Sequence, residues 1–501
     1  MTNRHGVRTT LAALGAMLTG AQAADAANVP PMRIGVSLSA PAYYRKTRSL
    51  ANLAAGSNWY AMDHHKLGPD EVDKDGNVKR LAPGTVLNRV LTAPNYATKS
   101  ATIRCTWKGQ GVLTATGRIQ NQRKVAGGFL FDLQNAVPPT GRVAAQLKLS
   151  EINPADPIRD IDCRETTIPA NARFDPFYVQ SLRGFKVIRF MDWQAANLNA
   201  PVTWATRHLP SAIDNAAGDG VAIEDMIALS NETGADPWFN LPWNADDDYY
   251  ERFARMVHDN LPAGRTVYIE LSNEVWNHRF RASQQAIQEG VAAGLDPEPW
   301  KAGLLRYAQK LSHVMDIWAK VYSDRPGKLV RIAACQNGTT CAKLVLGYAD
   351  TPRHIDALAT APYFGGRLNK TVFASPDELF AALTPEIDRT LDFALQAKAL
   401  AAQYGKRYIA YEGGQHLTFK DLDFLHKVER DPRMYDAYKA YLEGWRTKIG
   451  DTLVLYGSSG EIGRFGAFGL VEYAGQPLAD APKMRAVQDE IARLGQRNAS
   501  Q

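Results

Sequence analysis

From about residue 174 onward, short apolar runs alternate with longer segments of helical periodicity. The apolar runs have the length of strands, and most are followed by a loop and a helix-like segment. They are Phe185–Phe190, Asp236–Leu241, Thr266–Leu271, Lys328–Ala334, His354–Ala361, Arg407–Tyr411 and Thr452–Tyr456. An earlier run, Met32–Leu38, brings the expected number of strands to eight. Regular alternation predicts a parallel sheet, and eight units favour a closed (β/α)8 barrel.

Two helical segments between these strands carry clear signals. From Trp300 to about Tyr322, apolar residues recur at three- and four-residue spacing. A second helix is expected from about Pro385 to Gln403, with Thr384 as its N-terminal cap and Gly405 just past its end.

The stretch between the first two expected strands has a different character. From about Gly84 to Thr167, short segments of β-forming residues are separated by glycine and proline, and long helical periodicity is absent. We therefore predict an α/β fold, a (β/α)8 TIM barrel of residues 30–83 and 170–495. A β-rich antiparallel module at residues 84–169 is inserted between strands one and two.

The N-terminus has the features of a secretory signal peptide at residues 1–26. Arg4 and Arg8 precede the apolar stretch Leu11–Leu18, and two Ala-x-Ala patterns follow. The alternative is a frayed N-terminus in a cytosolic protein. No later stretch reaches about 18 uncharged apolar residues, so no membrane span is expected. The sequence thus predicts an exported protein, periplasmic or extracellular.

Composition narrows the possible partners. The 501 residues are 45% hydrophobic and 22% charged, which is ordinary for a globular protein. The net charge of +6 is small for this length and no basic run is dense, so neither nucleic acid nor an anionic membrane is expected. No Cys-x-x-Cys pair or histidine cluster has zinc spacing, and we predict no metal and no cofactor.

The four cysteines suggest disulfides in an exported protein. Sequence order favours Cys105–Cys163 and Cys335–Cys341, although four cysteines allow three pairings.

Barrel enzymes place their active sites at the C-terminal ends of the strands. Strand four is followed by Asn273-Glu274 and strand seven by Glu412. Because these strands lie on roughly opposite sides of an eight-stranded barrel, the two carboxylates should face one cleft. Such a pair suits glycosidic bond cleavage, in which one group protonates the leaving oxygen while the other attacks or activates water.

The same segments carry a family resemblance. Glu270-Leu271-Ser272-Asn273-Glu274 resembles the Asn-Glu signature of clan A glycoside hydrolases, and Tyr411-Glu412-Gly413 is similar to the strand-seven nucleophile of that clan. No family within the clan is assigned. The resemblance implies a retaining mechanism with Glu274 as general acid/base and Glu412 as nucleophile. A carboxyl separation near ~5.5 Å would correspond to retention and a wider one to inversion.

Three further roles are implied by the resemblance. Arg189, at the end of strand two, is expected near the nucleophile; a salt bridge inside the barrel is the alternative. Tyr363, after strand six, is expected to donate a hydrogen bond to the nucleophile. Asn273 is expected to bind the sugar 2-hydroxyl. Glu270 lies lower on the same strand face as Glu274 and is interpreted as a paired structural carboxylate.

Aromatic residues after the strands are candidate sugar platforms. Trp193, Trp243 and Trp276 follow strands two, three and four, and the apolar C–H face of a sugar can stack on such rings. His416, after strand seven, could bind a hydroxyl; a purely structural histidine is the alternative. No strand-eight tryptophan of the kind many clan members use is evident. Candidates to replace it are Tyr456, Phe465 and Phe468.

These observations predict an exported glycosidase that cleaves a β-linked oligo- or polysaccharide with retention. One alternative is a transglycosylase that uses the same residues. Another is a non-catalytic glycan-binding or matrix protein on a barrel fold, since a fold does not fix a function.

Overall fold

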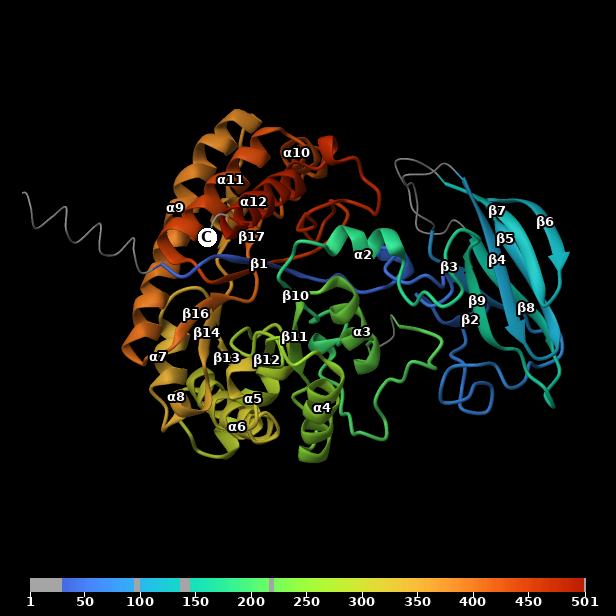
Figure 1. Ribbon diagram of the computed structural model, residues 1–501, viewed down its shortest axis with the longest axis horizontal. Coiled ribbons are helices and arrows are strands. Elements are labelled where there is room, and N and C mark those ends of the chain that lie inside the picture. Colours follow the sequence, from blue (N-terminus) through green and yellow to red (C-terminus); the bar gives the residue numbers. More distant parts are fainter. Residues whose placement is uncertain (1–28, 94–99, 136–144, 216–219, 500–501) are drawn as a thin grey trace, which may run out of the picture.

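A computed structural model describes residues 29–93, 100–135, 145–215 and 220–499 (Figure 1). The predicted signal peptide at residues 1–26 lies outside this range. Among the described residues, no helix is both long enough and apolar enough to cross a membrane.

A closed barrel of eight parallel strands forms the larger part of the molecule, and the predicted TIM-barrel fold is confirmed. The first and last strands pair with each other and complete the ring, with Arg33 opposite Thr452. In order around the barrel, the strands are β1 (Arg33–Ser37), β10 (Val187–Arg189), β11 (Asp236–Leu241), β12 (Val267–Leu271), β13 (Leu329–Ala334), β14 (Ala357–Thr360), β16 (Arg407–Ala410) and β18 (Thr452–Leu455).

Helices surround the barrel and bury their apolar faces against its outer surface (Figure 1). They are α2 (Pro176–Leu182), α3 (Ile223–Thr233), α4 (Asp247–Asn260), α5 (Arg281–Ala292), α6 (Pro299–Val321), α7 (Thr340–Leu346), α8 (Thr351–His354), α9 (Pro376–Gln403), α10 (Leu422–Glu429), α11 (Arg433–Gly444) and α12 (Pro482–Ala499). The periodic segment predicted from Trp300 is confirmed as α6.

Helix α9 begins nine residues before the predicted start at Pro385 (385 − 376 = 9). Ser375 caps it by accepting a hydrogen bond from the amide of Glu378, and the Glu378 carboxylate accepts one from the amide of Ala374. This reciprocal capping makes Pro376 the first helical residue. Pro385 therefore lies inside the helix, and the prediction that Thr384 is the cap is wrong.

The inside of the barrel is filled by its own inward-facing side chains. Trp238 and Tyr268 stack with their ring centroids 5.4 Å apart, and Ile409, Tyr411 and Val454 belong to the same buried cluster. The barrel is therefore a packed core whose chemistry is available only at the strand ends.

The β module lies to one side of the barrel (Figure 1). It has two four-stranded sheets, ordered β2-β3-β8-β5 and β6-β7-β4-β9, which share one hydrophobic core. Its strands are β2 (Trp59–Ala61), β3 (Leu87–Leu91), β4 (Ser100–Lys108), β5 (Gly111–Gly117), β6 (Ile119–Val125), β7 (Gly128–Gln134), β8 (Ala145–Ile152) and β9 (Arg159–Glu165).

The sheet and core of the β module also include residues before 84. Trp59–Ala61 pairs with Leu87–Leu91, and Leu53 and Val78 are buried in the module's core. The sequence does not reveal that these residues belong to the module, because a polar segment separates them from the strands that follow residue 84. Both favoured disulfides, Cys105–Cys163 and Cys335–Cys341, are present, and the first joins β4 to β9.

Candidate active site

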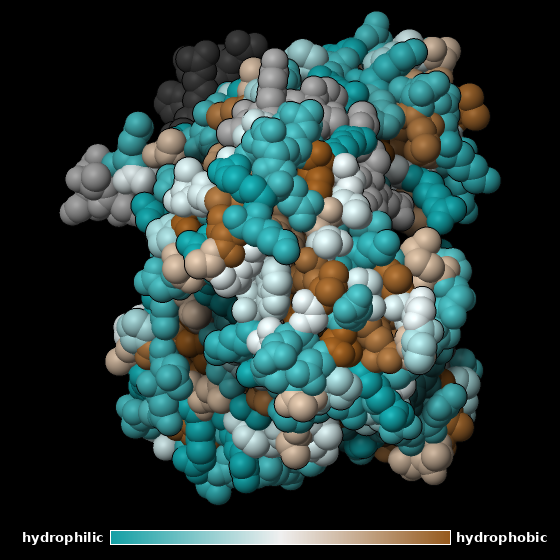
Figure 2. All heavy atoms as spheres, turned by 90° about the vertical axis from the view of Figure 1, so that its right-hand side faces the viewer, coloured by the Kyte–Doolittle hydropathy of each residue, from teal (hydrophilic) through white to brown (hydrophobic). Residues whose placement is uncertain are grey.

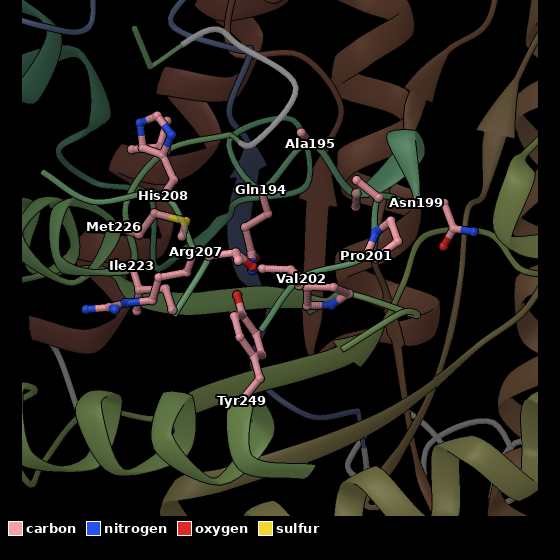
Figure 3. Close-up of a pocket in the computed structure, with 15 residues that line it drawn as sticks. Gln194, Ala195, Asn199, Pro201, Val202, Arg207, His208, Ile223, Met226 and Tyr249 are labelled. Atoms are coloured by element: carbon pink, nitrogen blue, oxygen red, sulfur yellow. The ribbon is translucent and has the colours of Figure 1, made fainter. Parts of the chain in front are cut away.

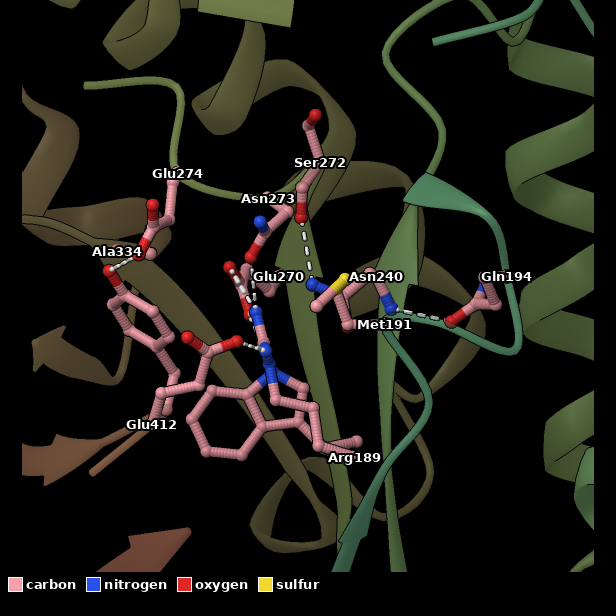
Figure 4. Close-up of polar contacts among 12 residues, drawn as sticks. Arg189, Met191, Gln194, Asn240, Glu270, Ser272, Asn273, Glu274, Ala334 and Glu412 are labelled. Carbon is pink, nitrogen blue, oxygen red and sulfur yellow. Dashed lines mark hydrogen bonds and ion pairs between the residues drawn. The ribbon is translucent and has the colours of Figure 1, made fainter. Parts of the chain in front are cut away.

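Glu274 and Glu412 lie at the same end of the barrel, where β12 and β16 finish (Figure 4). Glu274 is 9% exposed and Glu412 is 5% exposed. Two carboxylates so far from solvent need hydrogen-bond donors or protons to persist there. Each has a different set of donors.

Glu412 is held by a cation and a phenol. Its Oε1 accepts a hydrogen bond of 2.6 Å from the Arg189 guanidinium, and its Oε2 accepts one of 2.9 Å from the Tyr363 hydroxyl. Tyr363 belongs to β15 (Tyr363–Phe364), which pairs with β17 (Gly414–Gln415) just after Glu412. The structure thus brings both predicted neighbours to this carboxylate, so that each of its oxygens has a hydrogen-bond donor.

Arg189 connects three acidic or amide groups. It is fully buried, and besides Glu412 it donates to both oxygens of Glu270, at 3.0 and 3.1 Å, and to Asn273 Oδ1 at 2.8 Å. Burial alone would lower its pKa, but Glu270 and then Glu412 outweigh that effect and raise the pKa. Arg189 therefore fulfils both sequence interpretations, because it lies at the site and in a salt bridge inside the barrel.

Within the described part of the chain, the hydrogen-bond donors to the Glu274 carboxyl group are neutral. Its Oε1 accepts a hydrogen bond of 3.0 Å from the Tyr411 hydroxyl. Its Oε2 accepts one of 2.8 Å from the side-chain amide of Asn277. Burial, and next the charge of Glu412, raise the pKa of Glu274 to about 7. A carboxyl group with such a pKa can hold a proton at neutral pH and release it to a leaving group.

The backbone after β12 turns sharply to present Glu274. Ser272 has φ 60° and Glu274 has φ 44°, both in the left-handed region that non-glycine residues rarely adopt. Such conformations cost on the order of 1 kcal/mol each and persist where surrounding contacts hold them. Here the backbone carbonyl of Glu274 accepts a hydrogen bond of 2.8 Å from the backbone amide of Asn277, and this bond stabilises the turn.

Asn273 is fixed on both sides of its amide. Its Oδ1 receives the bond from Arg189, and its Nδ2 donates to Asn197 Oδ1 at 3.0 Å. One hydrogen of Nδ2 is left for another acceptor.

Two of the three predicted sugar platforms are core residues instead. Trp193 is fully buried against Phe174 and Phe190, and its indole donates to the carbonyl of Ser39 at 3.0 Å. Trp243 is 1% exposed. This burial contradicts their predicted stacking role, because neither ring face reaches solvent. Trp276 is half-buried and donates to the Tyr411 hydroxyl at 3.1 Å, so it remains the one candidate platform of the three.

Three aromatic side chains pack around the ring of Tyr363. Tyr456 and Phe468 each pack against the ring of Tyr363, with centroids 6.3 and 6.2 Å away. His416 joins them at 5.3 Å from Tyr363, and burial lowers the pKa of its imidazole. Phe465 is 79% exposed and does not belong to this group.

Sequence reasoning missed three residues near the carboxylates. Tyr411 and Asn277 bond Glu274 directly, although both were present in the segments that identified the site. Asp192 follows β10, and loss of hydration, opposed by Arg45 and reinforced by Glu412, raises its pKa to about 6. The rule that selected Glu274 and Glu412, an acidic residue just past a barrel strand, would also have found Asp192.

A separate cavity of about 330 Å³ lies among the residues that follow β10 and the first turns of α3 and α4 (Figure 3). Gln194, Asn199, His208 and Tyr249 line it, and neither catalytic candidate does. In the described part of the chain, no group of three or more His, Cys, Asp or Glu residues is arranged to hold a metal ion.

No protein-family model matches the sequence, and no curated protein matches it significantly. Among solved structures, the chain is similar to a GH51 arabinofuranosidase from Xanthomonas axonopodis pv. citri, at 12% identity over 58% of this chain and 62% of that one, with a TM-score of 0.37. It is also similar to a β-glucosidase from Thermotoga maritima in complex with castanospermine, at 13% identity over 63% of this chain and 84% of that one, with a TM-score of 0.36.

A third similar structure is a family 51 α-L-arabinofuranosidase from Bifidobacterium longum, at 14% identity over 64% of this chain and 69% of that one, with a TM-score of 0.39. At these identities and TM-scores, the likeness carries no conclusion about the activity of this chain.

Proposed function

We propose that this protein is an exported glycoside hydrolase that cleaves a β-linked oligo- or polysaccharide with retention of anomeric configuration. The observation that carries the proposal is the unequal pair of carboxylates at one end of the barrel. Glu412 is paired with the buried Arg189, while Glu274 has a pKa raised to about 7. A protonated carboxyl group opposite an ionised one is the requirement for acid-assisted nucleophilic displacement at a sugar.

In the first step, the carboxylate of Glu412 attacks the anomeric carbon while Glu274 gives its proton to the glycosidic oxygen. The C–O bond to the leaving group breaks, the aglycone departs as an alcohol, and an ester joins the sugar to Glu412. Arg189 and Tyr363 hold Glu412 in one orientation, so little rearrangement is needed before attack.

In the second step, the ionised Glu274 takes a proton from water as the water oxygen attacks the anomeric carbon. The ester bond breaks, Glu412 is again a carboxylate, and Glu274 is again protonated. Asn273 is positioned through Arg189 to bind the sugar 2-hydroxyl, a contact that strengthens in the transition state.

Export is the other part of the proposal. It is supported by the signal-like N-terminal sequence and by the two disulfides, which persist in oxidising compartments. Cell fractionation tests it, with the full chain accumulating in the cytosol as the contradicting result.

Substitution of each carboxylate tests the chemistry. Glu274→Gln and Glu412→Gln should each nearly abolish turnover of an activated aryl β-glycoside, with losses on the order of a thousandfold or more. Glu472→Gln is the matched control. It removes a carboxylate in the segment after β18 that pairs with Arg430. Undiminished turnover in either catalytic variant would refute the assignment, and proton NMR showing an inverted first product would refute retention.

A further inference from the structure

The loop after β1 joins the candidate active site to the β module. It bonds to the strand that carries Arg189, because the Leu38 amide donates to the carbonyl of Arg189 at 3.0 Å. Trp193, just beyond that strand, donates through its indole to the carbonyl of Ser39 at 3.0 Å. The loop is therefore fixed at the rim of the catalytic end of the barrel.

The same loop is fixed to the β module at its other end. The amide of Tyr43 donates to the carbonyl of Gly56 at 3.1 Å, three residues before β2 begins at Trp59. The two segments approach so closely that a Cβ at Gly56 would lie 2.7 Å from the carbonyl oxygen of Pro41. Glycine is therefore required for this contact between loop and module.

Three tyrosines, which we call the tyrosine strip (Tyr43, Tyr44 and Tyr60), follow this connection. The rings of Tyr43 and Tyr44 meet edge to face with centroids 5.3 Å apart. Tyr60 lies on β2, and partial burial together with the nearby Tyr43 raises the pKa of its hydroxyl. Tyr44 is 40% exposed and Tyr60 is 36% exposed, so both present ring surface to solvent.

Polar groups accompany these rings along the whole path. The Tyr60 hydroxyl donates to Gln146 Oε1 of β8 at 2.7 Å. The guanidinium of Arg45 lies 5.7 Å from the centroid of the Tyr44 ring and acts electrostatically on Asp192 beside Glu412. Contacts and electrostatic interactions therefore link Gln146 of β8, through the tyrosine strip and Arg45, to Asp192, which in turn interacts electrostatically with Glu412.

This surface has the chemistry of a sugar-binding site and lacks that of a protein-docking site. A tyrosine offers a broad apolar ring and a polar hydroxyl, which match the C–H faces and hydroxyls of sugars. The face of the molecule that carries the β module is mostly hydrophilic, with hydrophobic residues in small separate patches (Figure 2). Larger contiguous apolar patches are the ones that mark protein interaction sites.

We propose that the tyrosine strip binds sugar units of the same polysaccharide chain whose bond is cleaved at Glu274 and Glu412, several units away from that bond. The β module thereby extends the substrate-binding surface beyond the barrel. This inference rests on the proposed function, because it takes the occupant of the strip to be the continuation of a bound substrate.

Affinity gel electrophoresis tests the strip without requiring turnover. The probes are soluble β-linked glucans, mannan, xylan and galactan, each cast into a native gel, and the protein carries Glu274→Gln so that bound chains stay intact. On the polymer that retards this protein most, Tyr44→Ala and Tyr60→Ala should each weaken retardation about fivefold, the effect of losing one stacked ring. Tyr60→Phe keeps the ring and should retain most of the binding.

The matched control is Tyr404→Ala, which removes a tyrosine of similar exposure, 37%, at the end of α9. Because Tyr404 precedes β16, it lies at the end of the barrel opposite the carboxylates. This variant should bind like the parent. In the active enzyme, the strip variants should lose kcat/KM on the same polymer by a similar factor and keep it on a single-sugar aryl glycoside. Equal losses on both substrates would indicate a structural defect and overturn the inference.

The remaining outcomes are also decisive. Strip variants that bind every polymer like the parent, or a parent that no polymer retards, would overturn the inference. If retardation depends on the strip but the protein with Glu274 intact never turns over an aryl glycoside or polymer, the proposed function fails while the binding strip stands.

Discussion

Glu274 and Glu412 have the same side chain, and their neighbours give them different tasks. The cation Arg189 and the phenol Tyr363 bond Glu412, whereas the neutral Tyr411 and Asn277 bond Glu274. Because Arg189 is shared with Glu270 as well, the barrel interior fixes the position of the charge that stabilises Glu412. The proposed acid and the proposed nucleophile are thus distinguished by donors that come from four different strands and loops.

The raised pKa of Glu274 predicts the alkaline side of the activity profile. The acid must be protonated in the free enzyme, so kcat/KM should fall as the pH rises through about 7. A pH series with an unactivated substrate, which needs the proton most, measures this limb. A value of kcat/KM that stays constant to pH values well above this pKa would contradict the role of Glu274 as acid.

Removing the charge of Glu412 should lower that same pKa. Glu412→Gln leaves Glu274 buried but without its anionic neighbour, the second cause of its raised pKa. Infrared difference titration of the Glu274 carboxyl band, with a Glu274→Gln/Glu412→Gln double variant as the blank, gives the pKa directly. An unchanged pKa would show that the two groups do not interact.

Tyr411 should act as a positioning residue for Glu274. Tyr411→Phe removes the bond that favours the ionised acid and frees the Trp276 indole, so the alkaline limb should move to higher pH. Loss of orientation should also reduce kcat about tenfold. Tyr408→Phe is the control, since this buried tyrosine bonds Thr360 instead. A purely structural role would reduce stability in both variants and leave the pH profile unmoved.

Sequence reasoning located this site through strand ends and could not determine side-chain direction within the loops. Glu274, Glu412, Arg189 and Tyr363 meet because parallel strands deliver their last residues to one face. The same rule placed Trp193 near the site, but its indole turns inward to the carbonyl of Ser39. An indole that finds its acceptor inside the protein looks no different in sequence from one that faces a sugar.

At the scale of the elements, all eight barrel strands were predictable because each is an apolar run bounded by turn residues. Helix boundaries were harder, as α9 shows. Proline is favoured in the first turn of a helix and unfavourable inside one, so Pro385 indicated a start. The cap at Ser375 and the buried Leu379 and Leu383 instead extend the helix by two turns on the N-terminal side.

This arrangement predicts that Pro385→Ala stabilises the protein. Pro385 is exposed and lies within α9, where it provides no amide hydrogen for the carbonyl one turn earlier. The alanine variant should raise the free energy of unfolding by about 2 kcal/mol. Pro376→Ala is the control, because a first-turn amide has no helical partner and its stability should change little. Denaturant unfolding measures both, and a less stable Pro385→Ala variant would contradict the prediction.

At the scale of the whole molecule, the two disulfides close loops of very different length. Cys105 and Cys163 are 58 residues apart and join two strands of the β module, whereas Cys335 and Cys341 are 6 apart and join the end of β13 to the start of α7. A longer loop restricts the unfolded chain more. The first bond should therefore contribute about 4 kcal/mol and the second about 2 kcal/mol to stability.

Paired cysteine-to-alanine variants measure this difference. Removing Cys105 and Cys163 together should destabilise the protein more than removing Cys335 and Cys341 together, as followed by thermal unfolding of the β module and of the barrel with separate probes. The reverse order would indicate that local geometry, and not loop length, dominates the contribution of these bonds.

The pairing of β1 with β18 also determines the order in which the protein can assemble during synthesis. The β module is complete once residue 165 has left the ribosome, because all of its strands precede that point. The barrel must wait for Thr452–Leu455, since until then β1 and β16 each have one open edge. The nascent chain therefore carries a finished module beside an unclosed ring for nearly three hundred residues (452 − 165 = 287) of translation.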